Sequence, residues 1–275
     1  GMPENAELCH SLNPPIMDNT LRSHTENGLC TITLNRPEVF NAFNRDMALA
    51  LQAELSLCAG DDSIRAILLT GEGRAFCSGQ DLAEATDPSG HSLDTILSEH
   101  YNPLVLAMRA MQKPIVVAVN GVAAGAGANL ALCGDVVFAG HSAKFIQAFA
   151  GIGLIPDTGG TLTLPRLVGF AKASAWMMTG DRIGAEEAER HGMIYQAVAD
   201  ADLMAVATAA ALKLASQPTK AFALTKQALN AVVFPDLKAQ LELERRLQNI
   251  AGESHDFKEG VTAFLEKRNP QFKGH

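Results

Sequence analysis

Four glycine-rich turns and one aspartate are the residues whose types and spacing best suit chemistry. Each turn stands between an expected strand and an expected helix: Gly71-Glu72-Gly73, Ser78-Gly79, Gly125-Ala126-Gly127 and Gly159-Gly160. Such a turn exposes backbone N–H groups where the helix begins, and these can hold a carbonyl oxygen or a developing negative charge. For any one turn taken alone, a purely structural role is the simpler interpretation.

Asp157 precedes the last of these turns, and two roles are open to it. Its carboxylate could accept hydrogen bonds from the free N–H groups of a helix start, as an N-cap. It could also take and return a proton as a general base and acid. Spacing alone favours the cap and leaves catalysis open.

Several familiar catalytic and cofactor motifs do not occur in the sequence. No serine stands in a G-x-S-x-G motif, and no H-E-x-x-H or clustered His and Cys spacing suggests a metal site. Gly125-Ala126-Gly127 resembles the start of a dinucleotide fingerprint, but Leu130 occupies the third glycine position and no P-loop lysine follows. We therefore expect no metal, nucleotide or redox cofactor.

The composition is that of an ordinary folded domain. Apolar residues make up 47% of the 275 residues and charged residues 19%, which excludes intrinsic disorder. The formal net charge is −8 and no long run of like charges occurs, so we expect neither a nucleic-acid nor a membrane partner. Residues 114–134 carry no charge, but a proline, two asparagines and four glycines argue against a membrane span.

The cysteines and the first residues bear on compartment and processing. The cysteines are odd in number, widely spaced and without a C-x-x-C pair: Cys9, Cys30, Cys58, Cys77 and Cys133. This pattern predicts free thiols in a reducing, cytoplasmic compartment. Gly1 before Met2 resembles the remnant of a cleaved tag, and residues 1–27 are expected to be an N-terminal extension without a secretory signal.

Strand and helix patterns alternate through the first half of the chain. Residues 29–35 alternate in hydrophobicity, and Asn44 is expected to cap a helix with a buried stripe of Met47, Leu51, Leu55 and Cys58. Further strands are expected at 64–70, 115–119 and 135–139, and helices at 92–111 and 125–133. The alternation predicts an α/β core over residues 28–200.

The last part of the chain reads as helices only. Residues 201–216, 219–233, 236–250 and 254–268 have helical patterns separated by Pro218, Pro235 and Gly252. Two apolar edges are expected to pack in the core or against another subunit: Leu243, Leu247 and Ile250, and Phe257, Val261, Phe264 and Leu265. Residues 201–275 are therefore expected to form a C-terminal helical region that caps the core or joins subunits.

Five separated motifs together resemble the crotonase (enoyl-CoA hydratase/isomerase) superfamily. They are LNRP at 34–37, FCSGQDL at 76–82, KP at 113–114, NGVAAGAG at 120–127 and GLIPDTGGT at 153–161, and the resemblance continues into AFLEKR at 263–268. It implies a spiral of ββα turns with C-terminal helices, in a homotrimer or a dimer of trimers. It also implies that acyl-CoA thioesters bind, with the thioester enolate oxygen held by the backbone N–H groups of Gln80 and Ala126.

The carboxylates at the positions that the family uses for catalysis distinguish hydration from isomerisation. Hydratases of the family use two glutamates to position a water, but those positions carry Asn129 and Phe149 here. Asp157 stands where several isomerases and a dehalogenase of the family carry their working acid. The dehalogenase would also need a histidine and a tryptophan, where this chain has Asn102 and Phe149.

The resemblance therefore implies an acyl-CoA isomerase with Asp157 as catalytic acid and base. It is nearest to the family's ring-epoxide isomerases of phenylacetate breakdown, which can also move a double bond. An enoyl-CoA hydratase and a non-catalytic binding protein of the same fold are the alternatives. The CoA moiety is expected along Arg36, Phe40, Ala42, Ser78, Asp81 and Leu82, with Lys267 near its phosphates and with Asn129 and Phe149 lining the pocket.

Overall fold

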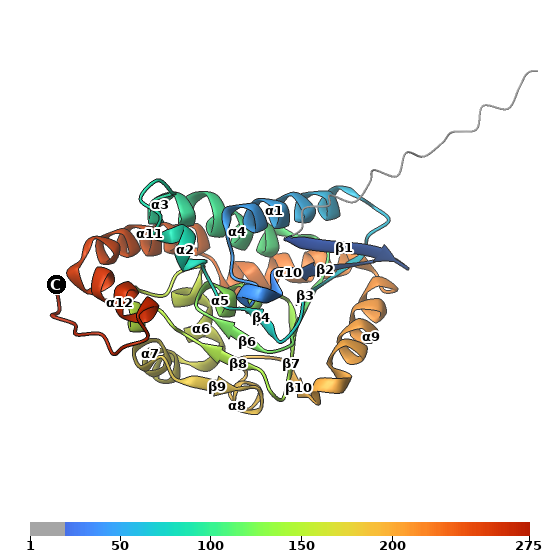
Figure 1. The fold of residues 1–275 in the computed structure, drawn as a ribbon. Helices are drawn as coiled ribbons and strands as arrows, with labels where there is room; N and C mark the ends of the chain where they lie inside the picture. Colours follow the sequence, from blue (N-terminus) through green and yellow to red (C-terminus); the bar gives the residue numbers. More distant parts are fainter. Residues whose placement is uncertain (1–19) are drawn as a thin grey trace, which may run out of the picture.

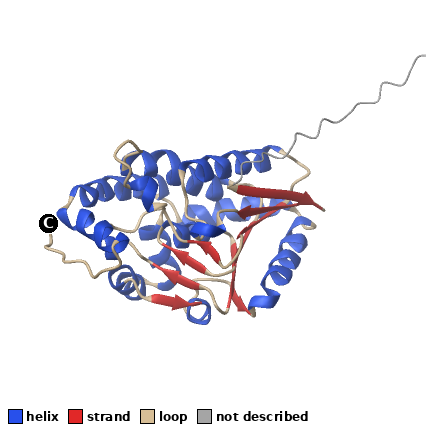
Figure 2. Cartoon of the chain, in the orientation of Figure 1, coloured by secondary structure: helices blue, strands red, loops and turns tan. Residues whose placement is uncertain are grey.

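The computed structural model describes residues 20–275, which form two sheets surrounded by helices (Figures 1 and 2). The six-stranded sheet has the order β1-β2-β3-β5-β7-β10 and the four-stranded sheet the order β4-β6-β8-β9. The expected tag remnant and Cys9 lie outside the described residues. The strands are β1 Leu21–Glu26, β2 Leu29–Leu34, β3 Ala66–Gly71, β4 Ala75–Cys77, β5 Ile115–Val119, β6 Val122–Ala124, β7 Val136–Gly140, β8 Lys144–Ile146, β9 Arg182–Gly184 and β10 Gln196–Val198.

Consecutive strands alternate between the two sheets, and this alternation makes the spiral. β3, β5 and β7 lie side by side in the large sheet, and each is followed at once by a strand of the small sheet, β4, β6 or β8. The pairs β3 with β5, β5 with β7, β4 with β6 and β6 with β8 are all parallel. The expected crotonase-like spiral of ββα turns is confirmed.

The central strands of the large sheet are buried on both faces, and β5 is apolar at every position. In β5, Ile115, Val117 and Val119 join one buried cluster, while Val116 and Ala118 join a second cluster on the opposite face. Successive side chains of a strand point to opposite faces, which explains this division. The continuous apolar run of β5 therefore contributes side chains to two hydrophobic clusters, one on each face of the sheet.

Helices cover both faces of this sheet (Figure 1). Asn44 caps α1 by accepting a hydrogen bond from Met47 N, and the expected stripe is buried. On the other face, alanines of α9 pack against β3 and β5. The α-helices are α1 Arg45–Gly60, α2 Leu82–Ala85, α3 Leu93–Thr95, α4 Asn102–Ala110, α5 Ala126–Ala131, α6 Gly160–Val168, α7 Phe170–Thr179, α8 Ala185–Arg190, α9 Leu203–Ala215, α10 Thr219–Val233, α11 Leu237–Glu253 and α12 His255–Leu265.

Two expectations need correction. Leu21–Glu26 forms β1, which pairs with β2, so the sheet begins before residue 28. The expected helix 92–111 is divided, because a π-helical segment, Ile96–Tyr101, separates α3 from α4. For the apolar edge of α11, packing in this chain's core is not seen, since Leu247 and Ile250 are 43% and 67% exposed whereas Glu244 and Gln248 are buried; packing against another subunit stays a prediction.

The uncharged stretch 114–134 folds as β5, β6 and α5 rather than as one helix. Within residues 20–275, no helix has both the length and the apolar character needed to cross a bilayer.

Candidate active site

A cavity of about 410 Å³ opens between the small sheet, the π-helical segment and the C-terminal helices. Its walls bring together residues far apart in sequence, from Ala42 to Phe264. Most of the lining is apolar, with a few polar groups, which is typical of a site for a small organic ligand. The apolar lining includes Leu82, Leu93, Ile96, Leu97, Phe149, Ile152, Leu154, Phe257 and Phe264.

Gln80 and Ala126, the expected oxyanion donors, both line this cavity. Their turns meet closely, since a Cβ on Gly79 would lie 2.9 Å from Ala124 O and 3.7 Å from Ala126 N. Gly79 also has φ +96°, so a side chain there would be both strained and crowded. No hydrogen bond within residues 20–275 uses the N–H of Gln80 or Ala126. Two unpaired backbone donors at one cavity wall are suited to a developing oxyanion.

Asp157 lines the same cavity and is 7% exposed. Its Oδ1 accepts a hydrogen bond of 2.8 Å from Thr158 Oγ1, and its Oδ2 accepts one of 2.8 Å from Gln248 Nε2. Burial raises the pKa of the Asp157 carboxyl to about 6, while these two hydrogen bonds act to lower it. A carboxyl with this pKa is ionised at neutral pH and can still take up a proton easily.

The capping role that spacing alone suggested for Asp157 is wrong. Its carboxylate contacts no backbone N–H of α6, whose N-cap residue is Gly159. Glu244 of α11 takes that place, because Gly159 N and Thr161 N donate to its carboxylate at 2.8 and 2.9 Å. Burial raises the pKa of Glu244 to about 7. Glu244 could not be recognised from the sequence, since nothing local links residue 244 to this turn.

Tyr101 is a second residue of the site that no sequence pattern indicated. It is the last residue of the π-helical segment, is 2% exposed and lines the cavity. Its hydroxyl donates a hydrogen bond of 2.9 Å to Gln80 Oε1. Tyr101 therefore fixes the side chain of Gln80, the residue whose backbone N–H is an expected oxyanion donor. π-Helical segments occur often at functional sites, but this one is visible only in the structure, so the sequence carried no signal for Tyr101.

The two positions expected to carry the hydratase glutamates hold no acid. Phe149 forms part of the cavity wall, as expected. Asn129 lies behind the wall rather than in it: its Nδ2 donates to the backbone oxygen of Asp157 at 2.8 Å and its Oδ1 accepts from Gln147 Nε2 at 2.8 Å. The expectation that Asn129 lines the pocket is therefore wrong.

The residues expected to hold CoA are only partly at the cavity. Ala42, Ser78, Asp81 and Leu82 line it. Arg36 and Phe40 do not line it. The Arg36 guanidinium pairs with the Asp81 carboxylate at 3.0 Å, and the Phe40 ring lies under the Arg74 guanidinium at 4.6 Å. The segment nonetheless runs beside the Gln80 turn, since Phe43 N donates to Gly79 O at 2.7 Å. Lys267 is exposed and outside the cavity lining.

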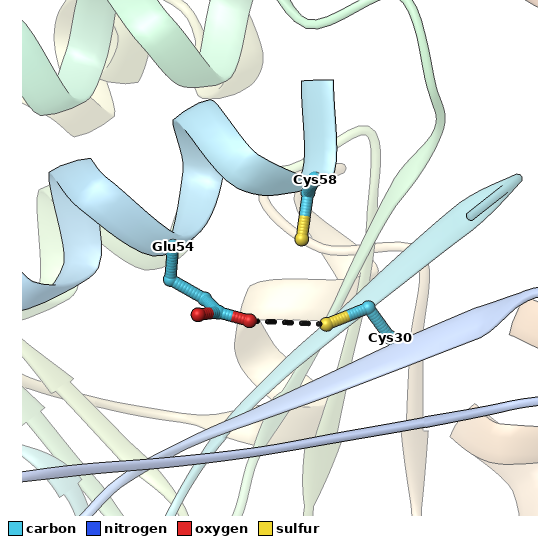
Figure 3. A group of neighbouring side chains, drawn as sticks. All are labelled: Cys30, Glu54 and Cys58. Atoms are coloured by element: carbon cyan, nitrogen blue, oxygen red, sulfur yellow. Dashed lines mark hydrogen bonds between the residues drawn. The ribbon is translucent and has the colours of Figure 1, made fainter. Parts of the chain in front are cut away.

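A group of metal-ligand side chains lies away from this cavity. Cys30 on β2 and Glu54 and Cys58 on α1 place their sulfur and oxygen atoms within 4.8 Å of one another (Figure 3). The Cys30 thiol donates to Glu54 Oε1 at 3.6 Å, and a hydrogen bond from Cys58 lowers the pKa of Cys30. Spacing suggested isolated cysteines, but the fold makes these two neighbours.

The sequence profile of the enoyl-CoA hydratase/isomerase family matches residues 24–275. The chain therefore belongs to this family of enzymes, as its motifs implied. Among its relatives, a protein of Escherichia coli (strain K12) named 1,2-epoxyphenylacetyl-CoA isomerase is 51% identical over 255 residues, which cover 92% of this chain and 97% of that one. A Rhodobacter capsulatus protein named probable enoyl-CoA hydratase is 52% identical over 93% of this chain and 98% of its own.

Solved structures agree with the fold. The crystal structure of an enoyl-CoA hydratase from Mycobacterium avium subsp. paratuberculosis is similar with a TM-score of 0.85 and 32% identity, over 92% of this chain and 98% of that one. An enoyl-CoA hydratase/isomerase from Pseudoalteromonas atlantica gives a TM-score of 0.84 and 35% identity, over 92% of this chain and 100% of the other.

Proposed function

We propose that this protein is an acyl-CoA isomerase in which Asp157 moves a proton along a conjugated thioester. The observation that carries the proposal is the state of the two carboxylates that line the cavity. Asp81 is paired with Arg36, whereas Asp157 is buried, has no cationic partner within residues 20–275 and has a pKa raised to about 6. Asp157 is therefore the group in this cavity best suited to proton transfer.

The reaction needs two proton transfers and no other reactant. Ionised Asp157 takes a proton from the carbon next to the thioester carbonyl, and the electron pair moves onto the carbonyl oxygen. The N–H groups of Gln80 and Ala126 hold the enolate oxygen, and one such donor is typically worth 10²- to 10³-fold in rate. Protonated Asp157 then returns the proton further along the conjugated system, so the double bond has moved and Asp157 is ionised again.

A ring epoxide of an aryl-acetyl thioester is the substrate that we favour. In it the C–C bond between the two oxygen-bearing ring carbons breaks as the ring expands to include the oxygen, and the same two proton transfers then move a double bond from the ring to the carbon next to the thioester carbonyl. The name of the E. coli relative supports this choice, and the apolar lining suits a ring. A linear 3-enoyl thioester presents the same acidic carbon and is the second substrate to test.

Hydration is the second candidate reaction, because the Rhodobacter relative is named as a probable hydratase at similar identity. Hydratases of the family position water with two carboxylates. In this cavity Asp157 is the one carboxylate without a cation partner, which weighs against efficient water addition.

We further propose where CoA lies and how the chain assembles in the cytoplasm. The CoA moiety follows Ala42, Ser78, Asp81 and Leu82, and Lys267 reaches phosphates at a neighbouring subunit. A homotrimer or a dimer of trimers would cover apolar side chains such as Val232, Ile250 and Phe264, which are 80%, 67% and 61% exposed. Analytical ultracentrifugation tests the assembly, and a monomer at micromolar concentration would contradict it.

A screen of three thioester classes tests the reaction. Purified protein is given a 2-enoyl-CoA, a 3-enoyl-CoA and a ring-epoxide aryl-acetyl-CoA, and products are identified by mass spectrometry. We expect turnover of the ring epoxide, the 3-enoyl thioester or both. Binding without turnover of any class would favour the non-catalytic alternative.

A further inference from the structure

One face of α11 contacts the turn that carries Asp157 through three polar side chains. Gln240, Glu244 and Gln248 are spaced by four residues, so they lie on the same side of the helix. Gln240 Nε2 donates to Thr161 Oγ1 at 2.7 Å, and Glu244 accepts from Gly159 N and Thr161 N. Gln248 accepts from Ile155 N at 2.9 Å and donates to Asp157 Oδ2 at 2.8 Å.

The turn needs such support because its backbone is strained. Thr158 has φ +56°, a left-handed conformation that is a genuine outlier for a β-branched residue. Strained residues of this kind persist where the surroundings over-determine them, often at active sites. The hydrogen bonds from α11 supply that constraint on both sides of Thr158, at Asp157 and at Gly159.

The Gln248 amide can have only one orientation in this place. The N–H of Ile155 needs an acceptor, so the amide oxygen must face Ile155 and the amide nitrogen must face Asp157. Gln248 is 1% exposed and is 91 residues from Asp157 in sequence. Its side chain is therefore a fixed donor aimed at one carboxylate oxygen.

We propose that Gln248 is a positioning residue for the reaction: it fixes the orientation of the Asp157 carboxylate and favours its ionised form before each proton transfer. This inference rests on the proposed role of Asp157 as the base. A donor to a carboxylate stabilises the charged form and leaves the remaining lone pairs free for the substrate. Gln248 also lines the cavity, so its loss would alter the wall beside the reacting carbon.

Other titratable groups near Asp157 cannot substitute for this donor. Glu244, from the same helix, would add negative charge when ionised and so disfavour an ionised Asp157. Tyr101, from the π-helical segment, donates its hydroxyl proton to Gln80 instead. Thr158 donates to the other oxygen, Oδ1. Gln248 is thus the one described donor to Oδ2.

Two substitutions of Gln248 and one neighbouring control test the inference. Gln248→Met keeps the volume but removes the donor. Gln248→Glu keeps an acceptor for Ile155 N and places an oxygen, rather than an N–H, against Asp157. Asn249→Leu removes a 2.5 Å hydrogen bond from α11 to Asp94 and leaves the Asp157 turn untouched.

The readout is the pH profile of kcat/KM for 3-enoyl-CoA isomerisation. In both Gln248 variants we expect the acid limb to move up by about one to two pH units, the range expected for one hydrogen bond to a charged group. We expect kcat to fall more than KM rises, because orientation rather than binding is lost. In Asn249→Leu the acid limb should stay in place even if the melting temperature falls. An unmoved limb in both Gln248 variants, or an equal shift in Asn249→Leu, would overturn the inference.

A direct titration separates this inference from the proposed reaction. The carboxyl carbon of Asp157 can be followed by ¹³C NMR in the full-length protein, with Asp157→Asn identifying its signal. A higher pKa in Gln248→Met than in the wild type would support the link between the two residues even if no thioester were isomerised. An unchanged pKa would refute the link even if the wild type proved an active isomerase.

Discussion

Asn129 donates a hydrogen bond of 2.8 Å from its side chain to the backbone oxygen of Asp157. By its motifs, Asn129 stands where we expect hydratases of the family to carry a glutamate. Here that position supports the turn that bears the single unpaired carboxylate of the cavity, instead of pointing an acid at the substrate. The same side chain also accepts from Gln147 Nε2, so both of its ends are occupied.

This arrangement predicts that Asn129→Leu destabilises the fold. The change would leave the Gln147 amide nitrogen buried without its partner, at a cost of about 1–3 kcal/mol. It would also remove one of the two hydrogen bonds to the Asp157 carbonyl, which keeps the one from Gly160 N, at a cost of about 0.5–1.5 kcal/mol. We expect the free energy of unfolding in urea to fall by about 2–4 kcal/mol. Asn269→Leu, the same exchange at an exposed site, should change it by less than about 0.5 kcal/mol. Equal effects of the two changes would contradict this account.

Hydration should be much slower than isomerisation. A missing positioned acid or base typically costs 10²- to 10⁴-fold in rate. Water addition to crotonyl-CoA should therefore be slower by about this factor than double-bond migration in 3-hexenoyl-CoA. Both rates can be followed by thioester absorbance in one preparation. Faster hydration of crotonyl-CoA than turnover of any 3-enoyl or ring substrate would mean that the proposed reaction is wrong.

The stability of the protein should depend on pH through Asp157. Burial raises its pKa from 3.8 to about 6, so the folded state keeps a proton that the unfolded chain has already released. The resulting stabilisation is complete below pH 4 and is lost as the pH rises through 6. Because Asp157→Asn removes the ionisation, the variant should gain up to about 3 kcal/mol over the wild type above pH 7.

Melting temperatures of both proteins between pH 4.5 and 8 check this prediction. The variant should become increasingly more stable than the wild type as the pH rises. A constant difference across that range would show that Asp157 is not protonated preferentially in the folded state. Glu244 titrates in the same range, but it is present in both proteins and its effect should largely cancel.

The described cysteines should resist alkylation while the protein is folded. Cys30, Cys58, Cys77 and Cys133 are all buried, and burial raises the pKa of Cys77 and Cys133 to about 12. Alkylating reagents attack the thiolate, so these two should react slowly, and so should Cys58, whose pKa is raised by its hydrogen bond with Cys30 and by burial. Cys30, whose pKa is lowered by the hydrogen bond from Cys58, should react first. Peptide mapping after timed iodoacetamide labelling gives the order, and early labelling of Cys77 would contradict it.

Local signals predicted much of this structure. The alternating and continuous apolar runs predicted β2 and β5, and the stripe after Asn44 predicted α1. The glycine turns were recognised as candidate donors, but the assignment of Gln80 and Ala126 and the catalytic role of Asp157 came from the resemblance to the family. Each of these depends on a pattern contained in a short segment. The π-helical segment was not predicted, because its apolar residues fit an ordinary helical period.

The contribution of α11 was hidden for a different reason. Its apolar residues suggested a face toward the core or another subunit, and in this chain Leu247 and Ile250 are exposed while the polar residues Glu244 and Gln248 are buried. These polar side chains are buried because their partners lie in the turn at Asp157, more than eighty residues earlier in the chain. The four-residue spacing of Gln240, Glu244 and Gln248 was visible in the sequence, but the turn to which these side chains bind was not.

The turnover of Asp157→Asn with a 3-enoyl-CoA or the ring-epoxide thioester tests the central claim most directly. The variant keeps the size of the side chain and should bind acyl-CoA with an affinity close to that of the wild type, as calorimetry would show. We expect its isomerase turnover to fall by a factor of about 10² or more, because the proton acceptor is gone. Full turnover in a folded, ligand-binding Asp157→Asn protein would contradict the assignment of Asp157 as the base.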